Sequence, residues 1–141
     1  MKALTLTQPW ATLVALSAKK IETRSWSTQY RGPMAIHAAK GFPRQARELC
    51  LQEPFRSALK KVLSAPDAID ELPLGKVVAL CVLKYCIPIT AAQARGAERA
   101  FGDYSAGRYA WLLTDIRKLK TPIAVRGALG LWTLDMDLPL D

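Results

Sequence analysis

Apolar and polar residues alternate in short stretches near the N-terminus, a pattern that predicts strands. Residues 4–7 and 21–26 fit short strands, and in residues 34–38 the apolar side chains face one way while the histidine faces the other. Pro9 suits the first position of a helix, where its missing N–H costs nothing, and this helix should end near residues 17–18. The N-terminal part of the chain is therefore expected to mix strands with one short helix.

The middle of the chain carries the periodicity of helices. Pro43 opens one helix, which is broken before Pro54. In residues 55–63, apolar side chains recur three and four positions apart, which is the stripe of an amphipathic helix. Residues 64–73 fit a loop, and residues 75–89 form the most strand-like stretch of the sequence.

The last third of the chain predicts shorter elements. Thr90 is expected to cap a short helix through residue 94, and strands are expected at residues 109–114, 123–125 and 129–134. The order of strands, then helices, then strands predicts an α+β protein with a curved or barrel-like sheet. The βαβ alternation of a parallel sheet and a glycine-rich phosphate loop are both missing from the sequence.

Length and composition fit one globular domain over residues 1–141. Hydrophobic residues make up 50% of the chain, the mean hydropathy is +0.06, and no internal repeat or low-complexity tract occurs. The longest apolar run, residues 77–83, is far too short for a membrane span, and the N-terminus is too polar for a signal peptide. These features predict a cytoplasmic protein with no membrane partner.

Positive charge is concentrated in two segments that lie far apart in the sequence. The formal net charge is +8. Residues 17–47 hold seven basic residues and one acid, and residues 95–126 hold seven basic residues and three acids, whereas residues 48–94 are neutral. If the fold brings the two segments together, they form an electropositive surface suited to phosphates; otherwise they are ordinary solvated side chains.

The cysteines and the single histidine argue against a metal site. Cys50, Cys81 and Cys86 form no CxxC motif, and we interpret them as buried or half-buried free thiols in a reducing compartment. We interpret His37 as a half-buried residue with satisfied hydrogen bonds rather than as a catalytic one. No metal and no cofactor are therefore expected.

Lys19, Glu22 and Arg24 are the candidates for catalysis. A lysine with positive charges nearby can act as a base or nucleophile, although Lys19 could equally be a helix-terminal lysine in solvent. Glu22 and Arg24 are two apart on a predicted strand and therefore share a face, where Glu22 could hold either basic group. On an open surface such a pair is worth under about 1 kcal/mol. In a cleft it would orient the arginine toward a phosphate or a base edge.

Aromatic, basic and hydroxyl side chains near Lys19, Glu22 and Arg24 suggest contacts to nucleic acid. Trp10 and Trp26 flank the basic residues, and stacking on an aromatic ring is worth roughly 1–3 kcal/mol per base, but both rings could instead belong to the core. Tyr30 and Arg31 lie on a predicted turn, where functional groups are common. The candidate contacts are Trp10, Lys19, Lys20, Arg24, Ser25, Trp26, Tyr30, Arg31, Lys40 and Arg126.

Several short motifs occur in an order that resembles one known family. Residues 17–24 are similar to the signature GxKxxExR of the ASCH domain family, with Lys19, Glu22 and Arg24 in register. The supporting motifs are Gln8-Pro9-Trp10-Ala11, Ser25-Trp26, Arg31-Gly32-Pro33, Tyr109-Ala110-Trp111, Arg126-Gly127 and Gly130-Leu131-Trp132. The resemblance covers nearly the whole chain.

The resemblance implies a PUA-like curved β-barrel flanked by short helices, with a cleft lined by the signature residues. The sequence departs from the family pattern at Ser17, where the signature has glycine. Glycine would allow a left-handed helix end at no steric cost, whereas serine either adopts that geometry with strain or ends the helix differently.

Three functions follow from the resemblance and the charge. The first is binding of nucleic acid, most of all single-stranded RNA, with single-stranded DNA as the other form. The second is a hydrolase that uses Lys19, either a ribonuclease or an amidohydrolase on an acylated cytidine nucleoside. The amidohydrolase branch has threonine where this chain has Glu22, which disfavours that activity. The third is an adaptor that binds a protein partner.

Overall fold

A computed structural model describes residues 1–136 and 138, and its strands form one mixed six-stranded sheet in the order β2-β5-β4-β3-β1-β6. The strands are β1 (Lys2–Leu6), β2 (Ile21–Arg24), β3 (Gly32–Ala38), β4 (Lys76–Pro88), β5 (Tyr109–Ala124) and β6 (Leu131–Thr133). β1 and β3 are parallel, and the other neighbouring pairs are antiparallel. The parallel pair was not expected from the order of elements along the sequence.

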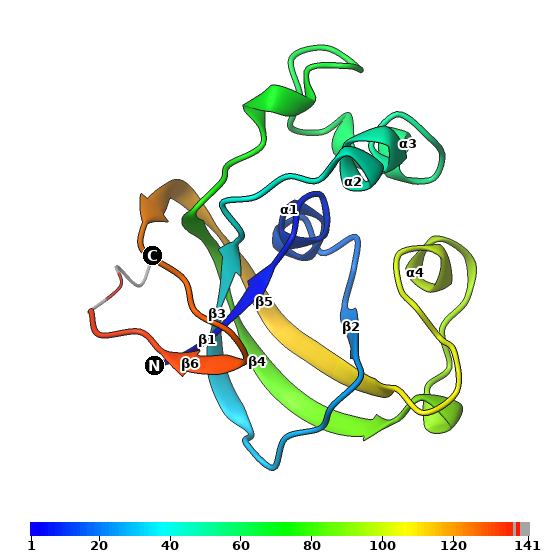
Figure 1. Ribbon diagram of the computed structural model, residues 1–141, viewed down its shortest axis with the longest axis vertical. Coiled ribbons are helices and arrows are strands. Elements are labelled where there is room, and N and C mark those ends of the chain that lie inside the picture. The colour runs from blue at the N-terminus through cyan, green and yellow to red at the C-terminus, as the bar shows by residue number, and fades with distance from the viewer. Residues whose placement is uncertain (137, 139–141) are drawn as a thin grey trace.

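Short helices lie at one end of the sheet and beside it (Figure 1). They are α1 (Trp10–Ala15), α2 (Arg44–Leu49), α3 (Phe55–Leu59) and α4 (Gly96–Ala100), with 3₁₀ turns η1 (Ile69–Glu71) and η2 (Ile89–Ala91). The sheet curls around α1 into a half-barrel that stays open between β1 and β2, because β2 is an edge strand. The predicted α+β class with a curved barrel is confirmed.

The largest apolar cluster fills the inside of the curl. On β1 and β3 alternate side chains point inward, and among them Leu4, Met34 and Ile36 are fully buried. They pack against α1 and against Trp111 of β5, which is fully buried. Burial of apolar side chains at roughly 25 cal/mol per Å² is the main force that holds this half-barrel together.

A second cluster attaches the outer helices to α1. Leu13 of α1 contributes its side chain to a group that includes Phe55 and Leu59 of α3. Phe101, which follows α4, joins the same group, and its ring lies 5.0 Å from that of Phe55. Residues far apart in the sequence are thereby brought to one side of the open seam between β1 and β2.

Both ends of α1 are fixed by residues of the proposed signature region. The Gln8 side chain is fully buried, and its oxygen accepts a hydrogen bond from the amide of Thr12 at 3.0 Å, one of the amides that a helix start leaves unpaired. At the other end Ser17 adopts a left-handed conformation with φ of 60°. The amides of Ala18 and Lys19 then both donate to the carbonyl of Leu13. Serine therefore reproduces the helix end that glycine favours, at a cost of about 1 kcal/mol.

Two predicted elements differ from the structure. The helix expected at residues 90–94 is absent; η2 occupies the start of that segment, and α4 forms later, where Phe101 can anchor it in the second cluster. The strands expected at residues 109–114 and 123–125 are one continuous strand, β5. Its middle is polar because only one face is covered there, and a bulge with Asp115 at φ of 50° shifts the register.

Other boundaries moved by a few residues. The strand expected at residues 129–134 is confined to β6, and the helix expected at residues 55–63 ends at Leu59 and continues as turns. Within the part of the chain that the structure describes, no helix combines the length and the apolar character needed to cross a membrane.

Candidate nucleic-acid interface

The open seam between β1 and β2 forms a cleft of about 450 Å³, called the main cleft below. Its walls come from the end of β1, from β2, from the start of α1, from the α2–α3 region and from the turn after α4. The lining residues are Thr5, Leu6, Thr7, Trp10, Glu22, Thr23, Arg24, Leu49, Phe55, Ala100, Phe101, Gly102, Asp103 and Arg108. Of the sequence candidates, the main cleft therefore receives Trp10, Glu22 and Arg24.

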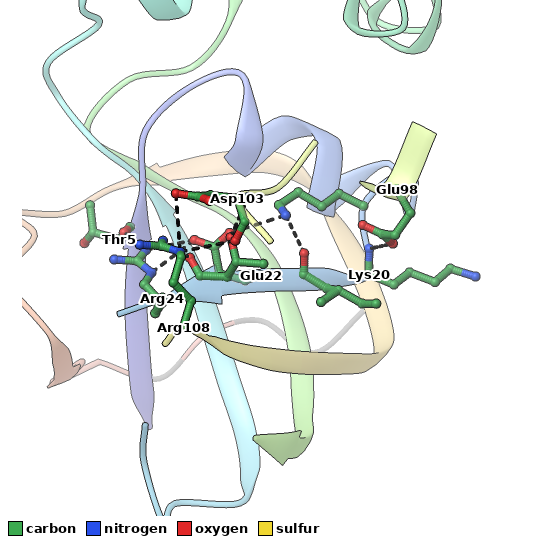
Figure 2. Close-up of polar contacts among 10 residues, drawn as sticks. Thr5, Lys20, Glu22, Arg24, Glu98, Asp103 and Arg108 are labelled. Atoms are coloured by element: carbon green, nitrogen blue, oxygen red, sulfur yellow. Dashed lines mark hydrogen bonds and ion pairs between the residues drawn. The ribbon is translucent and has the colours of Figure 1, made fainter. Parts of the chain in front are cut away.

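Arg24 bridges the seam. Its Nη2 donates to the backbone carbonyl of Thr5 at 2.8 Å, and its Nε donates to Glu22 Oε2 at 3.1 Å (Figure 2). The side chain of Arg24 is 24% exposed. The arginine thus joins β1 and β2, which are not paired with each other in the sheet, and its guanidinium group is held at the cleft wall.

Lys19 lies behind Glu22 rather than in the open cleft. Its side chain is fully buried, its Nζ is 3.4 Å from Glu22 Oε1, and it donates a hydrogen bond to the carbonyl of Ile21. The alternative of a solvated helix-terminal lysine is therefore wrong. Glu22 receives Lys19 on one oxygen and Arg24 on the other, so the carboxylate lies between two cations.

Arg108 lines the main cleft beside β2. Its Nη2 donates to the carbonyl of Thr23 at 3.1 Å, and its Nε lies 3.5 Å from a carboxylate oxygen of Asp103. Hydrogen bonds from the hydroxyl and the amide of Ser105 lower the pKa of Asp103, and the positive charge of Arg108 lowers it further. The main cleft therefore carries two arginines balanced by two carboxylates.

Each arginine keeps donors for a ligand. Within the described part of the chain, the Nη1 groups of Arg24 and Arg108 have no hydrogen-bond partner. Both guanidinium groups are already positioned by backbone carbonyls, so little side-chain entropy is lost when these donors meet a base edge or a phosphate.

Trp10 supplies the accessible aromatic surface of the main cleft. Its ring is partly exposed and stands perpendicular to that of Phe55, with 6.1 Å between ring centroids. Phe55 and Phe101 also line the cleft but are 5% and 3% exposed, so they support Trp10 rather than offer a face of their own. Trp26 is also partly buried, and its ring packs edge-on against Trp111 at 4.8 Å.

Polar groups behind the cleft wall are buried without partners. Among the described residues, the Tyr104 hydroxyl and Glu98 Oε2 have no hydrogen-bond partner. Burial raises the pKa of Tyr104 to about 12, and the nearby carboxylate of Glu98 contributes to this rise. The phenol is therefore neutral near pH 7. The other oxygen of Glu98 accepts the Lys20 amide at 2.6 Å and ties α4 to β2.

Several sequence candidates lie away from the main cleft. The exposed Lys20 side chain points away from it (Figure 2). Ser25, Trp26, Tyr30 and Arg31 lie on the connection between β2 and β3, and none of them lines the cleft. Arg31 there donates to the carbonyls of Thr28 and Tyr30, which fixes its side chain along its own turn. Their roles as nucleic-acid contacts stay predictions.

Lys40 and Arg126 line a second hollow of about 1,000 Å³, called the second groove below. Thr5 lines both hollows, so the two adjoin at this residue. The two basic segments of the sequence are thus brought to neighbouring hollows, Arg24 and Lys40 from the first and Arg108 and Arg126 from the second.

His37 is part of the wall of the second groove and is more buried than expected, at 2% exposure. Its Nε2 lies 2.7 Å from the carbonyl of Val125, which can only accept, so Nε2 carries the proton. Its Nδ1 then accepts from the Thr5 hydroxyl at 3.1 Å. The hydrogen bonds of His37 are satisfied, as the sequence interpretation held.

Sequence reasoning missed Arg108, Asp103 and Thr23 as cleft residues. Thr23 lies within the signature, between Glu22 and Arg24, whereas the place of Arg108 and Asp103 follows from the pairing of β2 with β5, which sets Arg24 opposite Tyr109. That pairing joins positions more than eighty residues apart and leaves no local signal. The three cysteines are free, with Cys50 and Cys81 buried, and the described residues contain no cluster of three potential metal ligands.

Comparison with known proteins agrees with the order of motifs along the chain. The family model of the ASCH domain matches residues 4–123. Activating signal cointegrator 1 of Mus musculus is 25% identical over 135 residues, and that of Homo sapiens is 26% identical over 137 residues. Each alignment covers 94% of this chain and 22% of the relative, so the chain spans about a fifth of these curated relatives. With a match that runs from β1 into the end of β5, this chain belongs to the ASCH domain family.

Proposed function

We propose that this ASCH domain binds single-stranded nucleic acid, with RNA as the first ligand to test. The observation that carries the proposal is the main cleft, which is lined by Trp10 together with Arg24 and Arg108. Its volume of about 450 Å³ lies within the roughly 300–1,000 Å³ of small-ligand sites, which suits one nucleotide at a time. The formal net charge of +8 supports the same class of ligand.

In this proposal the base enters the cleft and the sugar and phosphate stay at its mouth. Trp10 offers a stacking face, which tolerates any base because every base has a π-face. The free Nη1 donors of Arg24 and Arg108 reach an acceptor on the base edge or the nearest phosphate. A single strand fits better than a duplex, because a base must leave its stack to enter a cleft.

Binding is tested by fluorescence anisotropy with a labelled single-stranded RNA and a DNA of matched sequence, at low and moderate salt. Arg24→Ala is compared with Arg56→Ala, which removes the same charge from an exposed position on α3 outside both hollows. We expect wild type to bind, salt to weaken binding, and Arg24→Ala to lose roughly tenfold more affinity than Arg56→Ala. Equal losses in the two variants would refute a role for the main cleft.

A hydrolase is the second candidate, because Lys19, buried behind the cleft wall, is joined by ion pairs through Glu22 to Arg24 at the cleft. In such a reaction Lys19 would act as base or nucleophile, Glu22 would orient it, and Arg24 would stabilise developing negative charge. The substrate would be an RNA phosphodiester or, less well matched because of Glu22, the amide of an acylated cytidine.

The two functions separate in one experiment with Lys19→Met. Strand integrity is followed by gel in the same samples that are used for anisotropy. A hydrolase cuts RNA as wild type and fails as Lys19→Met while still binding it. A binding domain leaves the strand intact in both proteins.

A further inference from the structure

The second groove differs from the main cleft in the charges on its walls. Its lining includes Lys40 and Arg126, both exposed, and no acidic side chain. Among the described residues, neither basic group has a carboxylate oxygen within 4.0 Å. Both charges are therefore available to an anion at little desolvation cost, unlike the paired charges of the main cleft.

The wall beneath these two side chains is built from satisfied hydrogen bonds. Trp132 Nε1 donates to the Thr5 hydroxyl oxygen at 3.0 Å, Thr5 donates to His37, and His37 donates to the carbonyl of Val125. These hydrogen bonds link β6, β1, β3 and the segment that carries Arg126. The three donors in these hydrogen bonds are already used, so an anion here is held by the exposed cations.

Gly127 fixes the backbone next to Arg126. A Cβ atom at Gly127 would lie 2.6 Å from His37 Cε1 and 3.0 Å from the Thr5 hydroxyl oxygen. Only glycine lets this segment approach the histidine so closely, and this contact fixes the position of the neighbouring Arg126 backbone at the groove. Arg126 is thus placed by a fixed backbone although its side chain is exposed.

We propose that the second groove is a phosphate subsite, in which Lys40 and Arg126 hold the backbone of the same strand whose base occupies the main cleft. This inference rests on the proposed function. Thr5 lines both hollows, so they adjoin at this residue, and in this proposal the strand passes from one to the other there. The cleft with balanced charges reads the base, and the groove lined only by basic charges holds the phosphates.

The test compares two double variants that each remove one lysine and one arginine. Lys40→Ala/Arg126→Ala removes the groove cations, and Lys60→Ala/Arg56→Ala removes the same charge from exposed positions outside both hollows. The affinity for a labelled single-stranded RNA of six nucleotides is measured over a salt series, with a DNA of the same sequence in parallel. Urea denaturation of each protein verifies that it is folded.

We expect the groove variant to bind roughly tenfold or more weakly than the control variant at low salt. Its slope of log affinity against log salt should be smaller by about 1.4, because single strands release about 0.7 counterions per phosphate contact and two contacts are lost. The loss should be the same for RNA and DNA, because phosphates do not differ between them.

Failure of the phosphate subsite can be told apart from failure of the proposed function. If wild type binds the strand and the two double variants bind it equally, the phosphate subsite is refuted while the proposed function stands. If the groove variant loses affinity but keeps the wild-type salt slope, Lys40 and Arg126 do not contact phosphates. If wild type binds neither RNA nor DNA even at low salt, the proposed function falls and the subsite falls with it.

Discussion

The main cleft and the second groove share Thr5 but use charge in opposite ways. In the main cleft every ionic group is tied into the fold, since Arg24 bridges β1 to β2 and Glu22 lies against the buried Lys19. In the second groove Lys40 and Arg126 stand on the surface without ion pairs among the described residues. The charges of the cleft are paired within the fold, which fixes their positions, whereas those of the groove, in our proposal, are the ones that hold phosphates.

The largest expected effect is on stability and distinguishes the two regions at once. Glu22→Gln leaves the buried Lys19 without its counter-charge and should lower the free energy of unfolding by about 3–5 kcal/mol. Lys19→Met should cost less, because Glu22 keeps Arg24. Lys40→Ala should change stability by no more than about 0.5 kcal/mol. Urea denaturation measures all three, and similar values for Glu22→Gln and Lys40→Ala would erase the contrast.

The next largest expected effect is on binding and comes from removal of the Trp10 ring. Trp10→Ala removes the accessible aromatic face of the main cleft and should weaken nucleic-acid binding by roughly 1–3 kcal/mol, or about 5- to 150-fold. Trp10→Phe keeps a ring and should recover part of the loss. Anisotropy with the same RNA gives the affinities. An unchanged affinity in Trp10→Ala would mean that the base does not stack there.

Gly127→Ala tests whether the wall of the groove is rigid. The new methyl group would collide with His37, which is held by hydrogen bonds on both ring nitrogens, so we expect a loss of about 1–3 kcal/mol in unfolding free energy. Gly41→Ala is the matched control, because its Cβ would meet no atom within 4 Å. Thermal or urea unfolding compares the two variants. Equal stabilities would show that the groove wall around His37 shifts to accommodate the methyl group.

The smallest expected effect comes from a substitution that makes the charge of the main cleft more like that of the second groove. Asp103→Asn removes one of the two carboxylates and should raise affinity for nucleic acid by up to about fivefold. Because hydrogen bonds from Ser105 lower the pKa of Asp103, the wild-type carboxylate stays charged at pH 7 and loses its charge only as pH falls through that lowered value. Asp67→Asn, at an exposed position outside both hollows, controls for net charge.

Local patterns predicted the elements with one buried face and failed where burial depends on distant partners. The alternation in residues 34–38 gave β3 because its inward side chains are apolar and fully buried. The polar middle of β5 gave no strand signal, since only Leu119 of residues 117–121 is buried there. The helix α4 was misplaced because its anchor, Phe101, contacts α3, which lies far away in the sequence.

The sequence by itself determined the class of fold and the family, because both rest on residues close together or in a fixed order. Only the tertiary structure decided that Lys19 is buried, that Arg108 and Asp103 complete the main cleft, and that Lys40 and Arg126 share a separate groove. The physical reason is strand pairing: the register of β2 on β5 and of β1 on β3 brings together side chains whose separation along the chain carries no pattern.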